Sequence, residues 1–145
     1  MPILLLIITV VILDQFSKFY IQSHISLGMS IPVIADIFHI TYILNPGAAF
    51  GILEHQTVIF VAIAIGMVAA VLYFYPRIPR GHYPLRMGIG LMVGGALGNV
   101  VDRVKTGYVI DFFDFRIWPV FNVADIAIVT GVGLIVYSLI YLSND

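Results

Sequence analysis

Carboxylates are the side chains of this sequence best suited to chemistry. The 145 residues include eight Asp and Glu residues, seven Lys and Arg residues, four His residues and no Cys. The lack of Cys excludes disulfides, thiolate metal sites and a Cys nucleophile. The histidines are scattered and form no His-Glu-x-x-His motif, which argues against a zinc hydrolase; they are His24, His39, His55 and His82.

Serine and phosphate chemistry have no matching motif either. The chain contains no Gly-x-Ser-x-Gly sequence and no Gly-rich loop that ends in Lys-Ser or Lys-Thr. What remains is acid–base catalysis by carboxylates without a metal. Two neighbouring carboxyl groups share one proton, because both cannot easily ionise together. One then acts as a general base on water and the other as an acid toward a carbonyl, which is the chemistry of peptide hydrolysis by paired aspartates.

The composition places any such site in a membrane protein. Hydrophobic residues make up 61% of the chain and charged residues only 10%, with a mean hydropathy of +1.05. A soluble domain usually carries about 25% charged residues. The net charge of −1 provides no basic patch for nucleic acid. The length predicts a single domain over residues 1–145.

Four apolar segments are long enough to cross a bilayer, which takes about 20 residues. They are residues 3–21, 57–75, 85–101 and 123–142. Continuous runs of this kind predict helices, since barrel strands alternate over about 10 residues. We expect the first segment to be retained as a span, because no basic region precedes it and no small-x-small cleavage site follows. The fold class predicted is therefore an all-α membrane protein with four transmembrane helices.

The distribution of basic residues predicts the orientation. The connection Pro76–Pro84 holds Arg77, Arg80 and His82, whereas residues 22–56 contain no Lys or Arg. The positive-inside rule places Pro76–Pro84 in the cytoplasm, together with both termini. Residues 22–56 and 102–122 are then outer segments. Three basic residues oppose this assignment from the outer side; they are Arg103, Lys105 and Arg116.

The first outer segment has a strand pattern. Phe38, Ile40 and Tyr42 alternate with their neighbours at a period of two, and β-branched and aromatic residues dominate. We expect a strand pair or small sheet on the membrane surface. The sequence Asn45-Pro-Gly that follows predicts a turn.

The third span carries a stripe of small residues. Gly90, Gly94 and Gly98 recur every four residues on one helical face, and Asp102 continues that face. Such stripes allow close approach of helix backbones in lipid.

The predicted topology gathers nearly all polar residues of the spans at the outer side. Ionisable groups at that depth are costly and indicate a functional site. The polar residues gathered at the outer side are Asp14, Lys18, Asn45, Asn99, Asp102, Arg103, Asp111, Asp114, Asn122 and Asp125.

Each of these residues also has a structural interpretation. Asp14 and Lys18 have the spacing of a helical ion pair, with Lys18 able to reach the interface. Asp102 and Arg103 could be interfacial contacts, and Asn99 could join helices by hydrogen bonds. The remaining three interpretations are Asp114 as a surface or interfacial carboxylate, Asn122 as a helix cap and Asp125 as an acid favoured by the helix N-terminus.

Two other functional classes remain open from the residues alone. One is a small ion- or proton-coupled transporter or channel subunit, because buried Asp and Lys also form relays. The other is a non-catalytic scaffold built on the glycine stripe. A transporter would need carboxylates across the membrane depth or a pair of broken helices. Their concentration at one end favours an enzyme.

Five motifs, in order, resemble those of bacterial lipoprotein signal peptidases, also called signal peptidase II. The resemblance extends from Asp14 to the fourth span. The motifs are Asp14-Gln-x-Ser-Lys18, Asn45-x-Gly-Ala-Ala-Phe50, Gly94-Gly-Ala-x-Gly-Asn99-x-x-Asp102-Arg103, Val109-Ile-Asp111-Phe112 and Phe121-Asn122-x-Ala-Asp125.

The resemblance implies the site residues. Asp111 and Asp125 match the family's catalytic pair, a choice that spacing alone does not make. Supporting or substrate-binding positions are matched by Asp14, Lys18, Asn45, Gly47, Asn99, Asp102, Arg103, Asn122 and Ala124. It also implies four spans with a small extracytoplasmic β-cradle and a short periplasmic helix. We add the hypothesis that Asn45 and Arg103 position the substrate.

The resemblance further implies removal of signal peptides from diacylglyceryl-modified prolipoproteins, just before the lipidated cysteine. No cofactor and no metal is expected. The expected partners are the prolipoprotein, membrane lipid and globomycin-type inhibitors, and we expect a monomer in the bacterial inner membrane. Two departures are visible: a short connection between Asp111 and Asp125, and a tail at residues 143–145 without basic residues.

Overall fold

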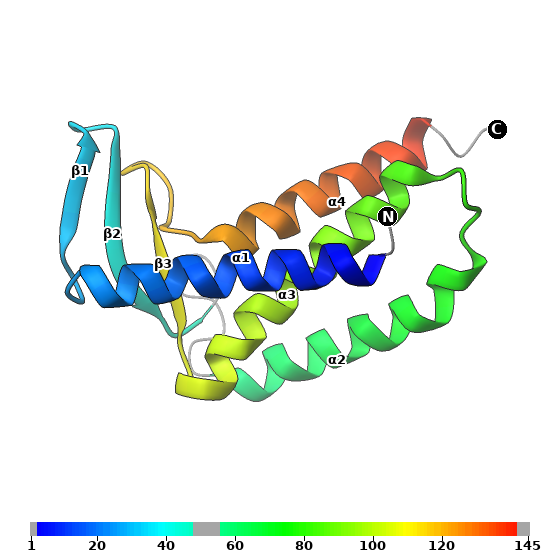
Figure 1. Cartoon of the computed structure of the whole chain (residues 1–145), viewed down its shortest axis with the longest axis horizontal. Helices are drawn as coiled ribbons and strands as arrows, with labels where there is room; N and C mark the ends of the chain where they lie inside the picture. The colour runs from blue at the N-terminus through cyan, green and yellow to red at the C-terminus, as the bar shows by residue number, and fades with distance from the viewer. Residues whose placement is uncertain (1–2, 48–55, 142–145) are drawn as a thin grey trace.

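The computed structural model describes residues 3–47 and 56–141. It has four long apolar helices with a small sheet at one end (Figure 1). The helices are α1 (Ile3–His24), α2 (Thr57–Phe74), α3 (Tyr83–Thr106) and α4 (Val123–Tyr141), and a short 3-10 helix, η2 (Tyr75–Arg77), follows α2. This confirms the predicted fold class of a mainly helical membrane protein with a small sheet. The expected short periplasmic helix is not among the described residues of the outer connections.

The third span is longer than the sequence indicated. We expected it to end at residue 101, but α3 continues to Thr106. Asp102 and Arg103 therefore belong to its last turns. The helix ends at Gly107, whose φ of 80° is left-handed and whose N–H bonds to the Arg103 carbonyl. The charged residues do not stop the helix because their side chains find partners inside the protein.

The glycine stripe of α3 allows the predicted close approach of a neighbouring helix, and that helix is α1. A Cβ added to Gly94 would lie 2.8 Å from Val10 Cβ, and one added to Gly98 would lie 2.6 Å from Asp14 Oδ2. One turn later Asp102 contacts Lys18. The two helices thus contact each other at every fourth residue. Because the glycines have no side chains, the backbones approach closely, and this brings Asp102 of α3 against Lys18 of α1.

The opposite side of α3 packs on α4. A Cβ added to Gly88 would lie 2.6 Å from the Gly131 carbonyl, so these backbones also approach closely. Helix α2 packs mainly against α3 and diverges from the other helices in Figure 1. Helices α1, α3 and α4 therefore form the compact part that supports the site.

The sheet is antiparallel with the order β1-β2-β3. Its strands are β1 (Ser30–Ile34), β2 (Phe38–Asn45) and β3 (Val109–Asp114). The first two strands match the strand pair expected from the sequence, whereas β3 comes from the second outer connection and was not predicted. A cluster of Ile21, Ile25, Tyr42, Ile110 and Phe112 joins the end of α1 to the sheet.

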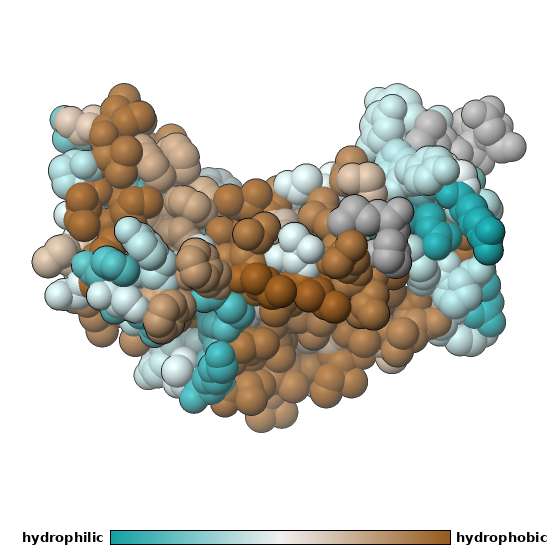
Figure 2. All heavy atoms as spheres, viewed as in Figure 1, coloured by the Kyte–Doolittle hydropathy of each residue, from teal (hydrophilic) through white to brown (hydrophobic). Residues whose placement is uncertain are grey.

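The outer surface of the helices is apolar. Figure 2 shows hydrophobic side chains over the middle of the molecule, with more hydrophilic residues toward the end away from the sheet. Exposed residues of this surface include Val58, Ile65, Leu72 and Val129. Such a surface suits contact with lipid acyl chains rather than water.

Candidate active site

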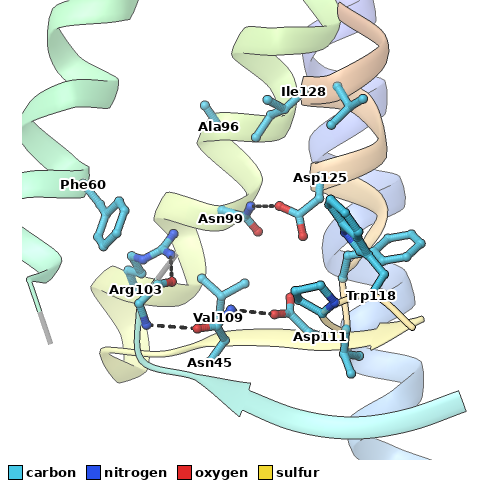
Figure 3. A pocket seen from close by; sticks show the side chains of 15 residues that line it. Asn45, Phe60, Ala96, Asn99, Arg103, Val109, Asp111, Trp118, Asp125 and Ile128 are labelled. Carbon is cyan, nitrogen blue, oxygen red and sulfur yellow. Dashed lines mark hydrogen bonds between the residues drawn. The ribbon is translucent and has the colours of Figure 1, made fainter. Parts of the chain in front are cut away.

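The predicted polar residues meet at the sheet end of the helices. A cavity of about 380 Å³ lies there, and its lining comes from β2, α2, α3, β3 and α4 (Figure 3). Its polar lining includes Asn45, Asn99, Arg103, Asp111 and Asp125. Most of the remaining lining is apolar, including Phe60, Val109, Trp118 and Ile128.

Asp111 lies on β3 and is only 1% exposed. The pairing of Asn45 with Val109 brings the end of β2 beside it. Asn45 Nδ2 donates to Asp111 Oδ2 at 2.9 Å, and Asn122 Nδ2 donates to Asp111 Oδ1 at 2.7 Å. Burial raises the pKa of Asp111 to about 7, and the negative charge of nearby Asp125 adds to the rise.

Asp125 lies at the third position of α4. Asn122 Oδ1 accepts the Asp125 N–H at 3.0 Å, and Asp125 Oδ2 accepts the Asn122 N–H at 3.1 Å. This reciprocal arrangement is a capping box, which confirms the interpretation of Asn122 as a helix cap. Asn99 Nδ2 donates to the other oxygen, Asp125 Oδ1, at 2.8 Å. Figure 3 shows Asp125 and Asp111 on facing sides of the same space.

A buried ion-pair network lies behind this cavity. Lys18 Nζ lies 2.8 Å from Asp14 Oδ2 and 2.7 Å from Asp102 Oδ2. The sequence interpretation of an Asp14–Lys18 pair is confirmed, but Lys18 does not reach the interface, because it is 1% exposed. Asp14 Oδ1 accepts the N–H of Ala124 at 3.0 Å, so the network also fixes the start of α4.

Arg103 joins α3 to the end of β2. Its Nη2 donates to the Gly47 carbonyl at 2.7 Å, and its guanidinium lies 4.0 Å from the centre of the Phe60 ring. The Gly47 N–H in turn donates to Asn45 Oδ1 at 3.0 Å, which gives the predicted turn. The buried Nε of Arg103 has no hydrogen-bond partner among the described residues.

Comparison with known proteins identifies the family. The family described as signal peptidase (SPase) II matches residues 6–141. The chain belongs to this family. It is 47% identical over 145 residues to the lipoprotein signal peptidase of Moorella thermoacetica, covering 100% of this chain and 97% of the relative. It is 52% identical over 124 residues to that of Desulfitobacterium hafniense, covering 85% and 82%.

A solved structure supports the same relationship. A bacterial membrane enzyme determined by the in meso method at 2.3 Å resolution matches with a TM-score of 0.91 and 38% identity. The match covers 99% of this chain and 90% of that enzyme. As a signal peptidase II family member, the chain is an aspartic-type protease of the bacterial inner membrane.

Asp114, another of the candidate carboxylates, also lies apart from the cavity. Asp114 accepts hydrogen bonds from Thr41 Oγ1 at 2.7 Å and Arg116 Nη1 at 3.1 Å. Burial acts to raise the pKa of Asp114, but these bonds and the charge of Arg116 outweigh it and hold the pKa below its usual value. It is 6% exposed, so it is not an exposed surface carboxylate, and its interpretation as an interfacial carboxylate stays a prediction.

Some residues near the site were missed by sequence analysis. Gln15 lies within the first motif but was not selected, and its Nε2 donates to Asp102 Oδ1 at 2.7 Å. Phe60 lies under Arg103 on a helix that is uniformly apolar, so nothing in the sequence distinguished it. Trp118 lines the cavity and, as the one tryptophan of the chain, offered a signal.

The described residues contain no set of three His, Cys, Asp or Glu side chains placed to hold a metal ion. The expected Ala48, Ala49 and Phe50 of the second motif lie outside the described residues, as does the tail.

Proposed function

We propose that this protein removes the signal peptide from diacylglyceryl-modified prolipoproteins, with Asp111 and Asp125 as the hydrolytic pair. The cut falls before the lipidated cysteine. One observation carries the proposal: within residues 3–47 and 56–141, Asp111 and Asp125 are the two carboxylates that line the cavity. Asp102, a rival at the same depth, is instead paired with Lys18.

The pair supplies one proton and one base. Because the pKa of Asp111 is raised to about 7, the pair retains one shared proton near neutral pH. The ionised carboxylate takes a proton from water, whose oxygen bonds to the scissile carbonyl carbon. The protonated carboxyl group polarises the carbonyl oxygen. The tetrahedral intermediate then collapses as the C–N bond breaks, and the nitrogen takes the proton that the carboxylate had removed from water, which returns the pair to its starting state.

Three asparagines hold the two carboxylates in place, through side-chain amides and one backbone N–H. Asn45 and Asn122 bind Asp111, and Asn99 and Asn122 bind Asp125. Asp14 and Asp102 lie behind the cavity, where both bind Lys18, and Asp14 also accepts the backbone N–H of Ala124. Ala124 is small and fully buried at the helix start that Asp14 fixes. Arg103 and the Asn45–Gly47 turn position the substrate peptide, which would give a carbonyl partner to Arg103 Nε, an atom that has none among residues 3–47 and 56–141.

The walls of the cavity suit an apolar substrate. Phe60, Ile128 and Val129 face it from the helices, and Trp118 faces it from the connection before α4. A signal peptide helix and a diacylglyceryl group both reside in the bilayer, so they arrive by lateral movement. The site accordingly faces the extracytoplasmic side, with both termini in the cytoplasm. Globomycin-type inhibitors bind this same cavity, and the enzyme acts as a monomer surrounded by membrane lipid.

Two matched substrates test the substrate assignment. One is a prolipoprotein with a diacylglyceryl-modified cysteine, and the other is the same precursor without the lipid. Purified protein in detergent should cut only the first, and mass spectrometry should find the lipidated cysteine at the new N-terminus. Equal cutting of both precursors, or a cut at another bond, would contradict the proposal.

A further inference from the structure

The ammonium of Lys18 makes one contact that charge pairing does not require. It lies against Asp14 Oδ2 and Asp102 Oδ2, which balance its charge, and also 3.0 Å from Asn99 Oδ1. An ammonium has three N–H groups and no acceptor, so all three donors are used. Because Lys18 can only donate, the group of Asn99 that faces it must be the amide oxygen.

The orientation of Asn99 follows from this contact. The oxygen and nitrogen of an amide are nearly equivalent in shape, so a partner must decide which way the group points. With the oxygen on Lys18, the amide N–H points at Asp125 Oδ1, 2.8 Å away. The Asn99 oxygen also accepts an N–H from Asn122 at 3.0 Å. Lys18 does not line the cavity, but it contacts Asn99, which does.

The two carboxylates of the pair have different surroundings. Both oxygens of Asp125 accept N–H groups, and the residue sits in the first turn of α4, where the helix N-terminus favours negative charge. Asp111 accepts hydrogen bonds from two side-chain amides and lies on strand β3 rather than in the first turn of a helix. The donors around Asp125 thus suit an ionised carboxylate, whereas Asp111 is the better place for the proton.

We propose that Lys18 is a positioning residue that, by holding the Asn99 oxygen, keeps the Asn99 N–H on Asp125 and assigns Asp125 as the base and Asp111 as the acid. This inference rests on the proposed function. The raised pKa of Asp111 agrees with it. Charged groups surround the start of α4 from α1 (Asp14, Lys18), α3 (Asp102, Arg103) and β3 (Asp111), and α2 has none.

The Lys18→Met variant tests the inference. Without the ammonium, the Asn99 oxygen keeps only the Asn122 N–H, so the amide is held less firmly and its N–H is no longer fixed on Asp125. With the lipidated prolipoprotein as substrate, kcat at pH 7 should fall at least about tenfold, while KM stays within about twofold. The acid limb of the kcat profile should move to higher pH by about one unit. An acid limb unchanged from the wild type would overturn the proposal.

A second variant separates positioning from charge balance. Lys18→Met combined with Asp102→Asn removes the buried carboxylate that Lys18 neutralised, so the net charge of the chain equals that of the wild type. Because Asn99 still lacks the Lys18 ammonium, the shifted acid limb should persist, and this variant decides the matter where the single one does not fold. Recovery of the wild-type profile would mean that Lys18 only balances charge.

Two controls run beside these variants. Lys105→Met changes an exposed lysine at the outer end of α3 and should keep the wild-type profile. Asp111→Asn and Asp125→Asn should both be inactive. If they still cut, the proposed function fails whatever Lys18 does; if they are inactive and Lys18→Met behaves as wild type, only the inference about Lys18 fails.

Discussion

Lys18 of α1 and Asp102 of α3 form a buried ion pair, with 2.7 Å between Nζ and Oδ2. The other oxygen of Asp102 accepts an N–H from Gln15 at 2.7 Å. Both oxygens are therefore occupied by groups behind the cavity. This contact separates Asp102 from the proposed hydrolytic pair and makes it part of the framework that joins α1 to α3.

Loss of this ion pair should destabilise the protein. In Asp102→Asn, Lys18 keeps Asp14 but loses a charged partner, and a hydrogen bond to a charged group is worth about 1.5–3 kcal/mol. The midpoint of thermal unfolding in detergent should fall by several degrees. Asp36→Asn is the control, because Asp36 is exposed in the turn between β1 and β2 and its left-handed φ of 59° also suits Asn. Equal midpoints for both variants would contradict the framework role of Asp102.

The close contact of Gly98 with Asp14 predicts a second effect. A Cβ at Gly98 would lie 2.6 Å from Asp14 Oδ2, so Gly98→Ala should displace a carboxylate that fixes Lys18 and the start of α4. Overpacking of this kind costs about 1–3 kcal/mol, and activity should fall as well. Gly66→Ala on α2 is matched, since nothing lies within 4 Å of its Cβ, and it should behave as wild type. Unfolding and cleavage assays on both variants check this.

Much of the fold was predictable because hydropathy and small-residue spacing are local signals. The four spans and the closely packing glycine face of α3 followed from them, although the sequence did not show that α1 is the partner helix. Strand β3 did not, because nearly all of Val109–Asp114 is buried and the alternation that marks a half-exposed strand is missing. The end of α3 was also misplaced, since its charged last turns are stabilised by partners on other elements.

The sequence predicted the membrane depth at which the site residues gather, but not which of them belong to the cavity. The predicted topology placed Asp102 and Asp111 on the same side of the membrane, and residue types alone did not show which of the two is catalytic. The distinction depends on side-chain direction: Asp102 turns toward α1, whereas Asp111 on β3 turns toward Asn45 and Asn122. Only motif resemblance selected Asp111 from the sequence, and the role of Asn99 as a link between Lys18 and Asp125 was not visible there.

The raised pKa of Asp111 predicts a pH dependence of stability and of activity. The unfolded carboxyl group loses its proton near its ordinary value of 3.8, the folded one near 7, so the folded state binds more protons between these values. Stability therefore falls as pH rises through this window. Asp111→Asn removes the ionising group, so above pH 7 it should be more stable than the wild type by more than about 1 kcal/mol. Thermal unfolding from pH 5 to 8 measures this.

Cleavage should also decline as pH rises through about 7, because the pair then loses its shared proton. A kcat profile that keeps rising well above that pH, or a stability difference between Asp111→Asn and wild type that does not grow with pH, would contradict the state assigned to Asp111.

The proposed orientation predicts the accessibility of single cysteines. The chain has no Cys, so each introduced thiol is labelled without background. Val33→Cys on the exposed face of β1 should react with a membrane-impermeant thiol reagent in intact spheroplasts. Gly81→Cys, in the connection between η2 and α3 with open space around its Cβ, should react only after permeabilisation. The reverse pattern would place the sheet and the cavity in the cytoplasm.

The most direct test of the Asp111–Asp125 pair compares three Asp→Asn variants in cleavage of the lipidated prolipoprotein. Asp114 is the matched control, because it lies on the same strand as Asp111 but pairs with Thr41 and Arg116 outside the cavity. Asp111→Asn and Asp125→Asn should each lose at least about 100-fold in kcat while remaining folded, and Asp114→Asn should cut at nearly the wild-type rate. Near-wild-type cutting by a folded Asp111→Asn or Asp125→Asn enzyme would contradict the account.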